Sequence, residues 1–246
     1  MSDWGGITGW RALRLGLLLG AWLQVTPGHA FQRVDITPGE YERWPYYCQA
    51  APHTKVTPPA GFQRPHLSDE DKAVSSAIGI WHYCIGYIKI QRAELYRNSD
   101  RGKELLASMG RDFADLRYSF DKIDKSHPWA AEMAITLARG YRLVGKSEQA
   151  LALLQQARAR LPDYPLVYSV ISSIYFDQGD YPKAAEVLEE GNRQTGGENP
   201  ELNYFLGLAY AYDGQLDKAK RQAEISRELG YPLSGLDNKI RRMQAQ

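Results

Sequence analysis

A histidine and a cysteine stand close together in the segment Trp81-His82-Tyr83-Cys84, and they are the residues best suited to do chemistry. Such a pair can act as a nucleophile with its base, or as two ligands of a metal ion. On a helix, however, side chains separated by one residue point in different directions. His53 and His66 lie in a proline-rich stretch and have no ligand spacing to this pair. We therefore predict a structural role for the cluster, with a redox or metal site as the alternative.

The N-terminus has the pattern of a cleavable export signal. Arg11 and Arg14 precede a short apolar run, Leu15–Val25, and small residues follow at Gly28 and Ala30. A positive region, a short apolar region and a small-x-small site are typical of a signal peptide, here cut after Ala30. The alternative is a membrane anchor, but a helix needs about 20 apolar residues to span a bilayer. We expect a periplasmic or secreted protein without a membrane span after cleavage.

Cys48 and Cys84 are the two cysteines of the chain. In an oxidising compartment the default state of such a pair is a disulfide. The bridge would constrain the unfolded chain and contribute roughly 3–4 kcal/mol to stability. The alternative is a pair of reduced thiols, one near Trp44 and Tyr47 and the other beside His82. We predict the bridge.

The composition is that of a globular protein and indicates no charged partner. Of the 246 residues 43% are apolar and 24% are charged, and the net charge of +1 leaves no broad basic surface for nucleic acid. The chain has no Gly-rich phosphate loop, no nucleophile elbow and no H-E-x-x-H motif. Carboxylates are scattered over predicted helix surfaces, as at Glu186, Glu189 and Glu190. We therefore expect no catalytic site, no metal and no cofactor, which predicts that the protein is not an enzyme.

The second half of the chain repeats itself with a period of about 34 residues. Each unit has a glycine that follows a tyrosine by four positions and precedes an alanine by five. The tyrosines are Tyr141, Tyr175 and Tyr210, the glycines Gly145, Gly179 and Gly214, and the alanines Ala150, Ala184 and Ala219. The glycine supplies the left-handed conformation that ends a first helix, and the alanine lets the second helix approach closely. The pattern predicts a series of helix–turn–helix units.

This pattern resembles the tetratricopeptide repeat (TPR), whose units stack into a solenoid. It predicts an all-α fold with three regular units, Ala131–Tyr164, Pro165–Asn199 and Pro200–Leu233. The last unit needs a cap, and Ser234–Arg242 has the amphipathic pattern of a capping helix. The predicted organisation is a signal peptide (1–30), a Pro-rich aromatic segment (31–67), a divergent helical repeat (68–130), three regular repeats (131–233) and a C-terminal capping helix (234–246).

Upstream of the regular units the pattern weakens but persists. Ser68 and the acidic residues after it predict the start of a long helix that reaches Arg97, where Asn98–Gly102 breaks the chain. The segment 113–123 has the apolar pattern of a second helix. Before Ser68 the prolines forbid a long helix. We expect the aromatic segment Trp44–Cys48 to pack on the long helix, held there by the predicted bridge.

In TPR proteins the first helix of each unit lines the concave surface, so the resemblance implies a protein-binding groove. The positions expected to be exposed there are Glu132, Ile135, Arg139, Arg142, Ser169, Ser173, Phe176, Asp177, Glu201, Tyr204, Leu208 and Tyr212. Arginines and aromatic residues dominate binding energy at interfaces, so this set suits an extended peptide or a partner's helix. Family members that clamp a C-terminal carboxylate use Lys and Asn in the first unit. Ile135 and Arg139 stand there instead, which disfavours that mode.

The leading hypothesis is an exported scaffold or adaptor that binds a protein partner through its groove. By analogy with exported TPR proteins, it would serve the assembly of a cell-envelope complex. The first alternative is a redox or metal-handling protein that uses Cys48, Cys84 and His82, and a count of free thiols would distinguish it. The second is a subunit of a larger complex that uses its aromatic N-terminal segment as the contact, which deletion of residues 31–67 would test.

Overall fold

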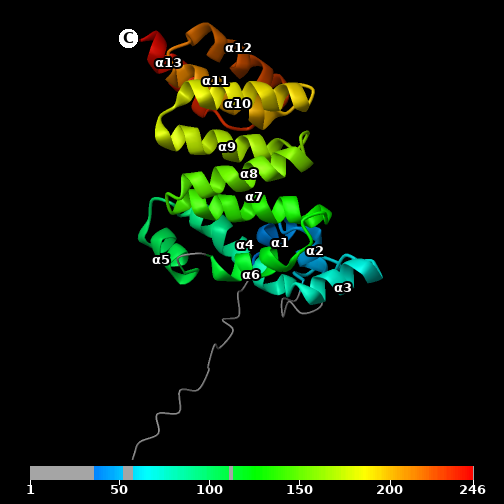
Figure 1. Cartoon of the computed structure of the whole chain (residues 1–246). Helices are drawn as coiled ribbons and strands as arrows, with labels where there is room; N and C mark the ends of the chain where they lie inside the picture. Colours follow the sequence, from blue (N-terminus) through cyan, green and yellow to red (C-terminus); the bar gives the residue numbers. More distant parts are fainter. Residues whose placement is uncertain (1–35, 52–57, 111–112, 246) are drawn as a thin grey trace, which may run out of the picture. The chain divides into compact units, whose positions relative to one another are not determined.

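The computed structural model describes residues 36–51, 58–110 and 113–245. The predicted export signal with its cleavage site after Ala30, and also His53, lie outside these residues. The described part contains thirteen helices and no strand (Figure 1). None of the helices in these ranges has the length and apolar character that crossing a membrane requires. The predicted fold class, all-α with TPR-like helical repeats, is confirmed.

Six helices form the three regular repeats. They are α7 (Pro128–Leu143) with α8 (Ser147–Arg160), α9 (Pro165–Gln178) with α10 (Tyr181–Gln194), and α11 (Pro200–Tyr212) with α12 (Leu216–Glu228). Each of these helices packs on the next, and α13 (Gly235–Gln244) packs against α11 and α12 (Figure 1). The order of the helices along the chain is therefore their order in space, as in a solenoid.

A proline, a glycine and an alanine set the local geometry of each repeat. Proline stands in the first turn of α7, α9 and α11, where a helix has no intrahelical partner for a backbone N–H. The turn glycines have φ angles of 76°, 72° and 80° at Gly145, Gly179 and Gly214. Glycine enters this left-handed region without strain, so the first helix ends there. The alanines that pack the second helices are fully buried: Ala150, Ala184 and Ala219.

The capping helix α13 covers the last repeat. Leu236 and Ile240, the two apolar residues of its predicted inner face, are buried. Gly207 of α11 makes room for them, because a Cβ at that position would lie 2.4 Å from Leu236 Cδ2. In the repeat pattern, a small residue at this position lets a neighbouring helix approach closely. Here that neighbouring helix is the cap, α13.

The region before α7 differs from the prediction of one long helix. It contains α3 (Asp69–Ala77), α4 (Ile80–Leu95), α5 (Asp100–Ser108) and α6 (Ala114–Lys122). The expected helix from Ser68 to Arg97 is wrong, because the chain breaks at Gly79, whose φ is 58°. The Ser119 hydroxyl of α6 donates to the Gly79 carbonyl at 2.9 Å, and a Cβ at Gly79 would lie 2.9 Å from Tyr118 Cε1. Contact with α6 therefore requires a glycine at the break.

The segment predicted only to break the chain after α4 instead begins another helix. The Ser99 hydroxyl accepts a hydrogen bond from the Gly102 backbone N–H at 3.3 Å and so caps α5. The new helix packs on α4. A Cβ at Gly102 would lie 2.3 Å from the Tyr96 carbonyl oxygen, so α5 turns back on the end of α4 at a distance that only glycine allows. The stretch from Ser68 to α7 thus holds four helices where two were expected.

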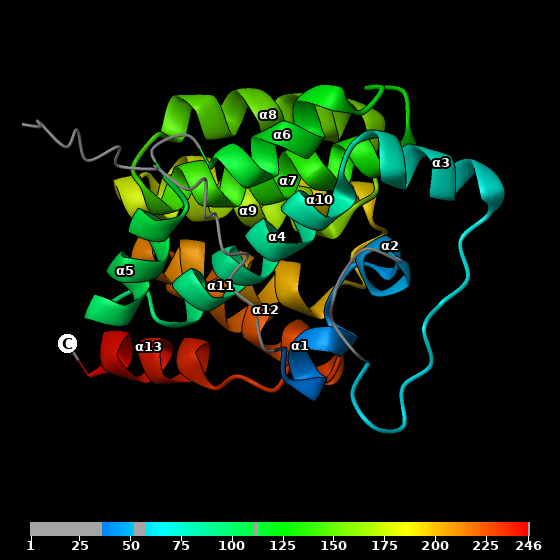
Figure 2. The same cartoon turned by 90° about the horizontal axis from the view of Figure 1, so that it is seen from below.

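Two short helices, α1 (Pro38–Glu42) and α2 (Tyr46–Ala50), are drawn in blue in Figure 2. Helix α2 packs on α4, and Glu40 of α1 forms an ion pair with Arg92 of α4. The predicted disulfide between Cys48 and Cys84 is present and joins α2 to α4. Trp44 Nε1 donates to the Cys84 carbonyl at 3.1 Å. The Tyr47 ring stacks on that of Trp129 of α7, with centroids 4.6 Å apart. The expected packing of the aromatic segment is confirmed, and α4 is the helix that it covers.

Candidate binding groove

A cleft of about 510 Å³ lies along the first helices of successive units. Side chains from α4, α7, α9 and α11 form its wall, and the loop after α1 contributes Arg43. The residues that line it are Arg43, Tyr87, Gln91, Glu94, Arg139, Arg142, Leu166, Ser169, Val170, Ser173, Glu201 and Phe205. The cleft brings together five of the predicted groove residues, namely Arg139, Arg142, Ser169, Ser173 and Glu201.

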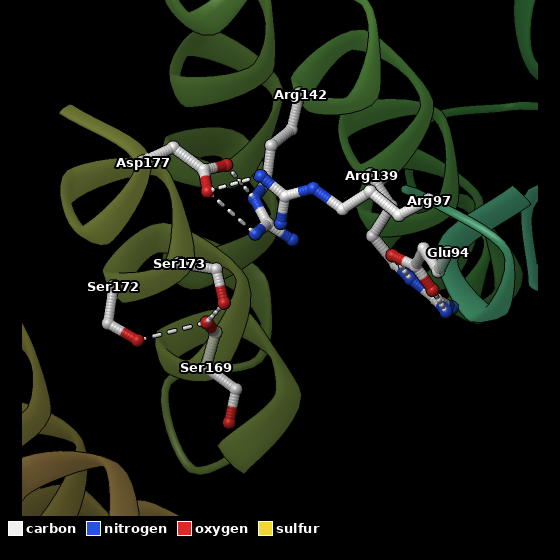
Figure 3. Close-up of polar contacts among 8 residues, drawn as sticks. All are labelled: Glu94, Arg97, Arg139, Arg142, Ser169, Ser172, Ser173 and Asp177. Atoms are coloured by element: carbon white, nitrogen blue, oxygen red, sulfur yellow. Dashed lines mark hydrogen bonds and ion pairs between the residues drawn. The ribbon is translucent and has the colours of Figure 1, made fainter. Parts of the chain in front are cut away.

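The floor of the cleft is one face of α9. Leu166, Ser169, Val170 and Ser173 are three or four residues apart, so helix periodicity puts them on the same side. Leu166 is partly exposed, and Val170 is buried. The hydroxyls of Ser172 and Ser173 donate to the Ser169 carbonyl at 2.9 and 2.8 Å, within their own helix (Figure 3). The hydroxyls of Ser172 and Ser173 are therefore already used within the helix.

Ion pairs connect the helices around the cleft. The Arg139 guanidinium of α7 binds Glu94 of α4, with Nε 3.1 Å from Oε1. Asp177 of α9 binds two arginines, with Oδ2 2.7 Å from Arg142 Nε and Oδ1 2.6 Å from Arg97 Nη2 (Figure 3). Burial raises the pKa of Asp177, but hydrogen bonds from Arg142 and Arg97 outweigh it and hold that pKa below its usual value. The arginines predicted as contact residues thus already have partners within the protein.

Three predicted groove residues are buried: Ser169, which is 5% exposed but lines the cleft, and two residues that do not line it. Ile135 is 1% exposed and Tyr204 is 7% exposed, so the prediction that they face a partner is wrong. The Tyr204 ring lies 4.5 Å from that of Tyr231 and packs against Gly235 at the start of the cap. Phe205, the next residue, lines the cleft instead. A helix turns by about 100° per residue, so an alignment error of one position can assign a buried residue to the groove.

Three further predicted residues lie outside the lining of the cleft. Phe176 and Tyr212 form an aromatic group with Tyr181, in which the Tyr181 and Tyr212 rings stack at 5.0 Å and the Phe176 and Tyr212 rings are 6.3 Å apart. Tyr212 is 48% exposed, and Lys239 Nζ lies 4.3 Å from its ring centroid. Leu208 is partly buried against the core. Phe176, Tyr181 and Tyr212 thus form a separate aromatic patch near the turn between α9 and α10.

Two glutamates among the predicted groove residues form no ion pair with any residue that the structure describes. Glu201 lines the cleft, and Glu132 lines a smaller cavity that shares part of its wall. Burial raises the pKa of both carboxyls. A hydrogen bond with Tyr47 opposes this for Glu132, and contacts with Ser169 and Arg139 oppose it for Glu201. The groove therefore contains acidic groups whose charge is only partly compensated.

The His82 and Cys84 cluster has no joint chemistry in this arrangement. His82 Nδ1 lies 3.2 Å from Asp115 Oδ1, and its ring lies 3.5 Å from that of Trp81 and 4.5 Å from that of Tyr118. Cys84 is fully buried and bonded to a cysteine. Within the described ranges, no group of three or more His, Cys, Asp or Glu is arranged to hold a metal ion. His82 thus lies against two aromatic rings and the Asp115 carboxylate rather than in a thiol site.

Comparison with known proteins gives one curated relative. No protein-family model matches the chain, and no solved structure does. The chain is 31% identical over 98 residues to the TPR repeat-containing protein YpiA of Bacillus subtilis (strain 168). The match covers 40% of this chain and 21% of that protein, so the chain spans about a fifth of its relative's length. A stretch of this length equals about three repeats, and over it the chain is similar to a tetratricopeptide repeat protein.

Proposed function

We propose that this chain is an interaction scaffold that binds a peptide segment or a helix of a partner protein in the cleft along α4, α7, α9 and α11. The lining of the cleft is the observation that carries the proposal. Leu166 and Phe205 are only partly buried there, beside the floor that Val170 forms. Apolar side chains that stay in contact with water on a concave surface, with charged groups around them, are typical of interaction sites.

The ion pairs around the cleft favour binding because they order its wall in advance. Arg139 connects α7 to α4, and Arg142 connects α7 to α9. A surface that is already ordered loses less conformational entropy when a partner binds. The volume of about 510 Å³ lies within the range of ligand clefts, about 300–1,000 Å³. It therefore suits a few side chains of a docked segment.

The same proposal places the protein outside the cytoplasm, as an adaptor in the assembly of a cell-envelope complex. Two observations support this. The sequence before Phe31 has the pattern of an export signal, and the chain's two cysteines form a bridge of the kind that persists in oxidising compartments. N-terminal sequencing of the protein from fractionated cells should find Phe31 as the first residue in the periplasm or medium. A cytoplasmic protein that keeps Met1 contradicts this part of the proposal.

Site-specific photocrosslinking in living cells tests the binding function. A photoreactive amino acid replaces Ser173, which lines the cleft. The matched control carries it at Glu186, an exposed residue of α10 that does not line the cleft. We expect the Ser173 derivative to crosslink to a discrete protein that mass spectrometry identifies, and the Glu186 derivative not to do so.

A second variant connects the crosslink to the apolar lining. Phe205→Ser in the Ser173 derivative should abolish the crosslinked species while the far-ultraviolet circular dichroism spectrum stays helical. The proposal is wrong if Ser173 gives no crosslink, if Glu186 gives the same product, or if the product survives Phe205→Ser.

A further inference from the structure

A smaller cavity of about 180 Å³ adjoins the cleft, and four of its nine lining residues are tyrosines. Its wall includes Tyr46 of α2, Tyr83 and Tyr87 of α4, and Tyr164 at the start of α9. Glu132 of α7 lies among these rings. Arg43, Tyr87 and Leu166 line both the cavity and the cleft, so the two hollows are neighbours.

Glu132 is the one acidic residue that lines this cavity. It is partly buried, and among the described residues no basic side chain forms an ion pair with it. Arg43 also lines the cavity, but its guanidinium lies near Gly39 of α1. The Glu132 carboxylate affects the tyrosines near it. Burial is the main cause of the raised pKa of Tyr83, Tyr87 and Tyr164, and the negative charge of Glu132 raises each of these pKa values further. The carboxylate is thus surrounded by rings and is poorly compensated by the protein itself.

The rings around Glu132 are held in place by their own contacts. The Tyr83 hydroxyl lies 2.8 Å from Thr136 Oγ1, and the Tyr87 hydroxyl donates to the Arg43 carbonyl at 3.1 Å. Trp129 Nε1 donates to the Tyr46 hydroxyl at 2.8 Å. The disulfide joins α2 to α4, the two helices from which these three rings extend. The cavity is therefore formed before a ligand arrives, which reduces the entropy lost on binding.

A carboxylate among aromatic faces selects for positive charge. The faces of tyrosine rings attract cations, and a buried carboxylate gains most from a cationic donor of hydrogen bonds. A neutral or acidic side chain in this position would leave the charge of Glu132 uncompensated. We propose that the tyrosine-lined cavity around Glu132 receives a basic side chain, lysine or arginine, of the partner segment that occupies the cleft. This inference rests on the proposed function and adds to it the chemistry of one partner residue.

The first test uses n-butylammonium chloride as the probe, since it has the charge and aliphatic stem of lysine. It is titrated into the protein produced from the full-length chain, with ¹³C-labelled tyrosine rings observed by NMR. We expect saturable shifts of the Tyr87 and Tyr164 ring signals, and no such shifts with n-butanol. Glu132→Gln should raise the apparent Kd about tenfold or more, because a charged hydrogen bond is lost. Glu186→Gln, an exposed change on α10, should leave it unaltered.

The rings have a matched pair of variants at Tyr164. Tyr164→Leu should weaken n-butylammonium binding about threefold, the range expected for one exposed cation–π contact. Tyr164→Phe keeps the ring and should keep the affinity. Equal shifts from the ammonium and the alcohol, or an unchanged Kd in Glu132→Gln, would overturn the inference. So would an equal loss of affinity in the two Tyr164 variants.

The second test asks whether the cation belongs to a docked segment. Random peptides displayed on phage are selected on the protein and, separately, on its Glu132→Gln variant. We expect the recovered peptides to share a lysine or arginine at a fixed distance from an apolar residue, and this basic preference to disappear with Glu132→Gln. Peptides that need Phe205 but show no basic preference overturn this inference and leave the proposed function standing. Recovery of no peptide that depends on Phe205 overturns both.

Discussion

The regular repeats and the N-terminal region of this protein are stabilised in different ways. From α7 to α12 each helix packs mainly on its sequence neighbours, through small residues such as Ala150 and Ala184. From α1 to α6, contacts between residues far apart in the sequence add to the packing of α4 on α5 and α6: the Cys48–Cys84 bridge and the stacking of Tyr47 on Trp129. Repeats stabilise one another through their shared interfaces. The region from α1 to α6 does not repeat the same interface, and contacts between distant residues help to stabilise it.

The candidate site draws on both regions. The cleft is formed mainly by the first helices of the repeats, whereas the tyrosine-lined cavity needs α2 and α4 as well as α7. The general groove thus comes from the repeated part, and the feature that would select a partner comes from the part that departs from the repeat. Substitutions that destabilise only the repeats or only the N-terminal region can test whether the two regions are independent.

Removal of the disulfide should have the largest effect. Cys48→Ser with Cys84→Ser is expected to lower the free energy of unfolding by about 3–4 kcal/mol, because the unfolded chain gains conformational freedom. Urea titration followed by circular dichroism measures the change, and the reduced wild-type protein should match the double variant. Hydrogen exchange should show the loss of protection in α2 and α4 and none in α11. Equal loss in α11 would contradict the separation of the two regions.

A substitution that overpacks a repeat should cause the second-largest loss of stability. A Cβ at Gly191 of α10 would lie 2.7 Å from Tyr168 Cγ and 2.8 Å from Tyr168 Cβ. The crowding costs about 1–3 kcal/mol, partly offset by the higher helix propensity of alanine, so Gly191→Ala should lower stability by about 1–2 kcal/mol. Thermal unfolding measures this, with Glu186→Ala as an exposed control on the same helix. A stabilised Gly191→Ala variant would show that the repeats are not in such close contact.

The ion pair between α1 and α4 should have a smaller effect that depends on pH. Glu40 Oε1 lies 2.6 Å from Arg92 Nε, and the hydrogen bond from Arg92 lowers the pKa of Glu40 from 4.5 to about 2. The unfolded chain therefore takes up this proton at higher pH than the folded protein does. The contribution of the pair is complete above pH 4.5 and is lost as the pH falls toward about 2.

Glu40→Gln measures the size of that contribution. Solvent screens the pair, so the variant should lose about 1 kcal/mol of stability at pH 7. The difference between wild type and variant should shrink as urea titrations move from pH 5 to pH 2.5. A difference that stays constant over this range would mean that the charge of Glu40 is not the cause.

The smallest expected effect lies at the edge of the cleft. Asp177→Asn removes the charge that binds Arg97 and Arg142, but these groups are partly exposed, so the loss should be about 0.5–1 kcal/mol. High salt should reduce the loss further, because it screens the wild-type pairs. Thermal unfolding at low and high sodium chloride measures both. A loss above the one caused by Gly191→Ala would reverse the order of these effects.

Much of the repeated region could be predicted from the sequence. The tyrosine, glycine and alanine pattern predicts the six repeat helices, because a left-handed glycine or a first-turn proline acts within a few residues of itself. The local sequence pattern was insufficient at Gly79. It predicted one continuous helix there, but the chain breaks between α3 and α4. The contact that requires the break comes from Ser119, far along the chain. Local propensity does not contain such a contact.

The candidate site could be predicted in part. Helix periodicity placed Arg139, Ser169 and Ser173 on the cleft side. It failed at Tyr204 and Ile135, because only packing against neighbouring helices shows which of two adjacent residues faces inward. Glu132 and Tyr164 come from different helices and neighbour several other tyrosines, and no spacing in the sequence places them in one cavity.

The sequence by itself determined the helical repeats, their glycine turns and the amphipathic cap, since these depend on residues a few positions apart. It also contained the pair of cysteines, whose bridge follows once the compartment is assumed to be oxidising. Tertiary structure alone decided the break at Gly79, the partners of the arginines, and the rings gathered around Glu132. The physical reason is range: periodicity records which side of a helix is buried, whereas a binding cavity depends on where separate helices meet.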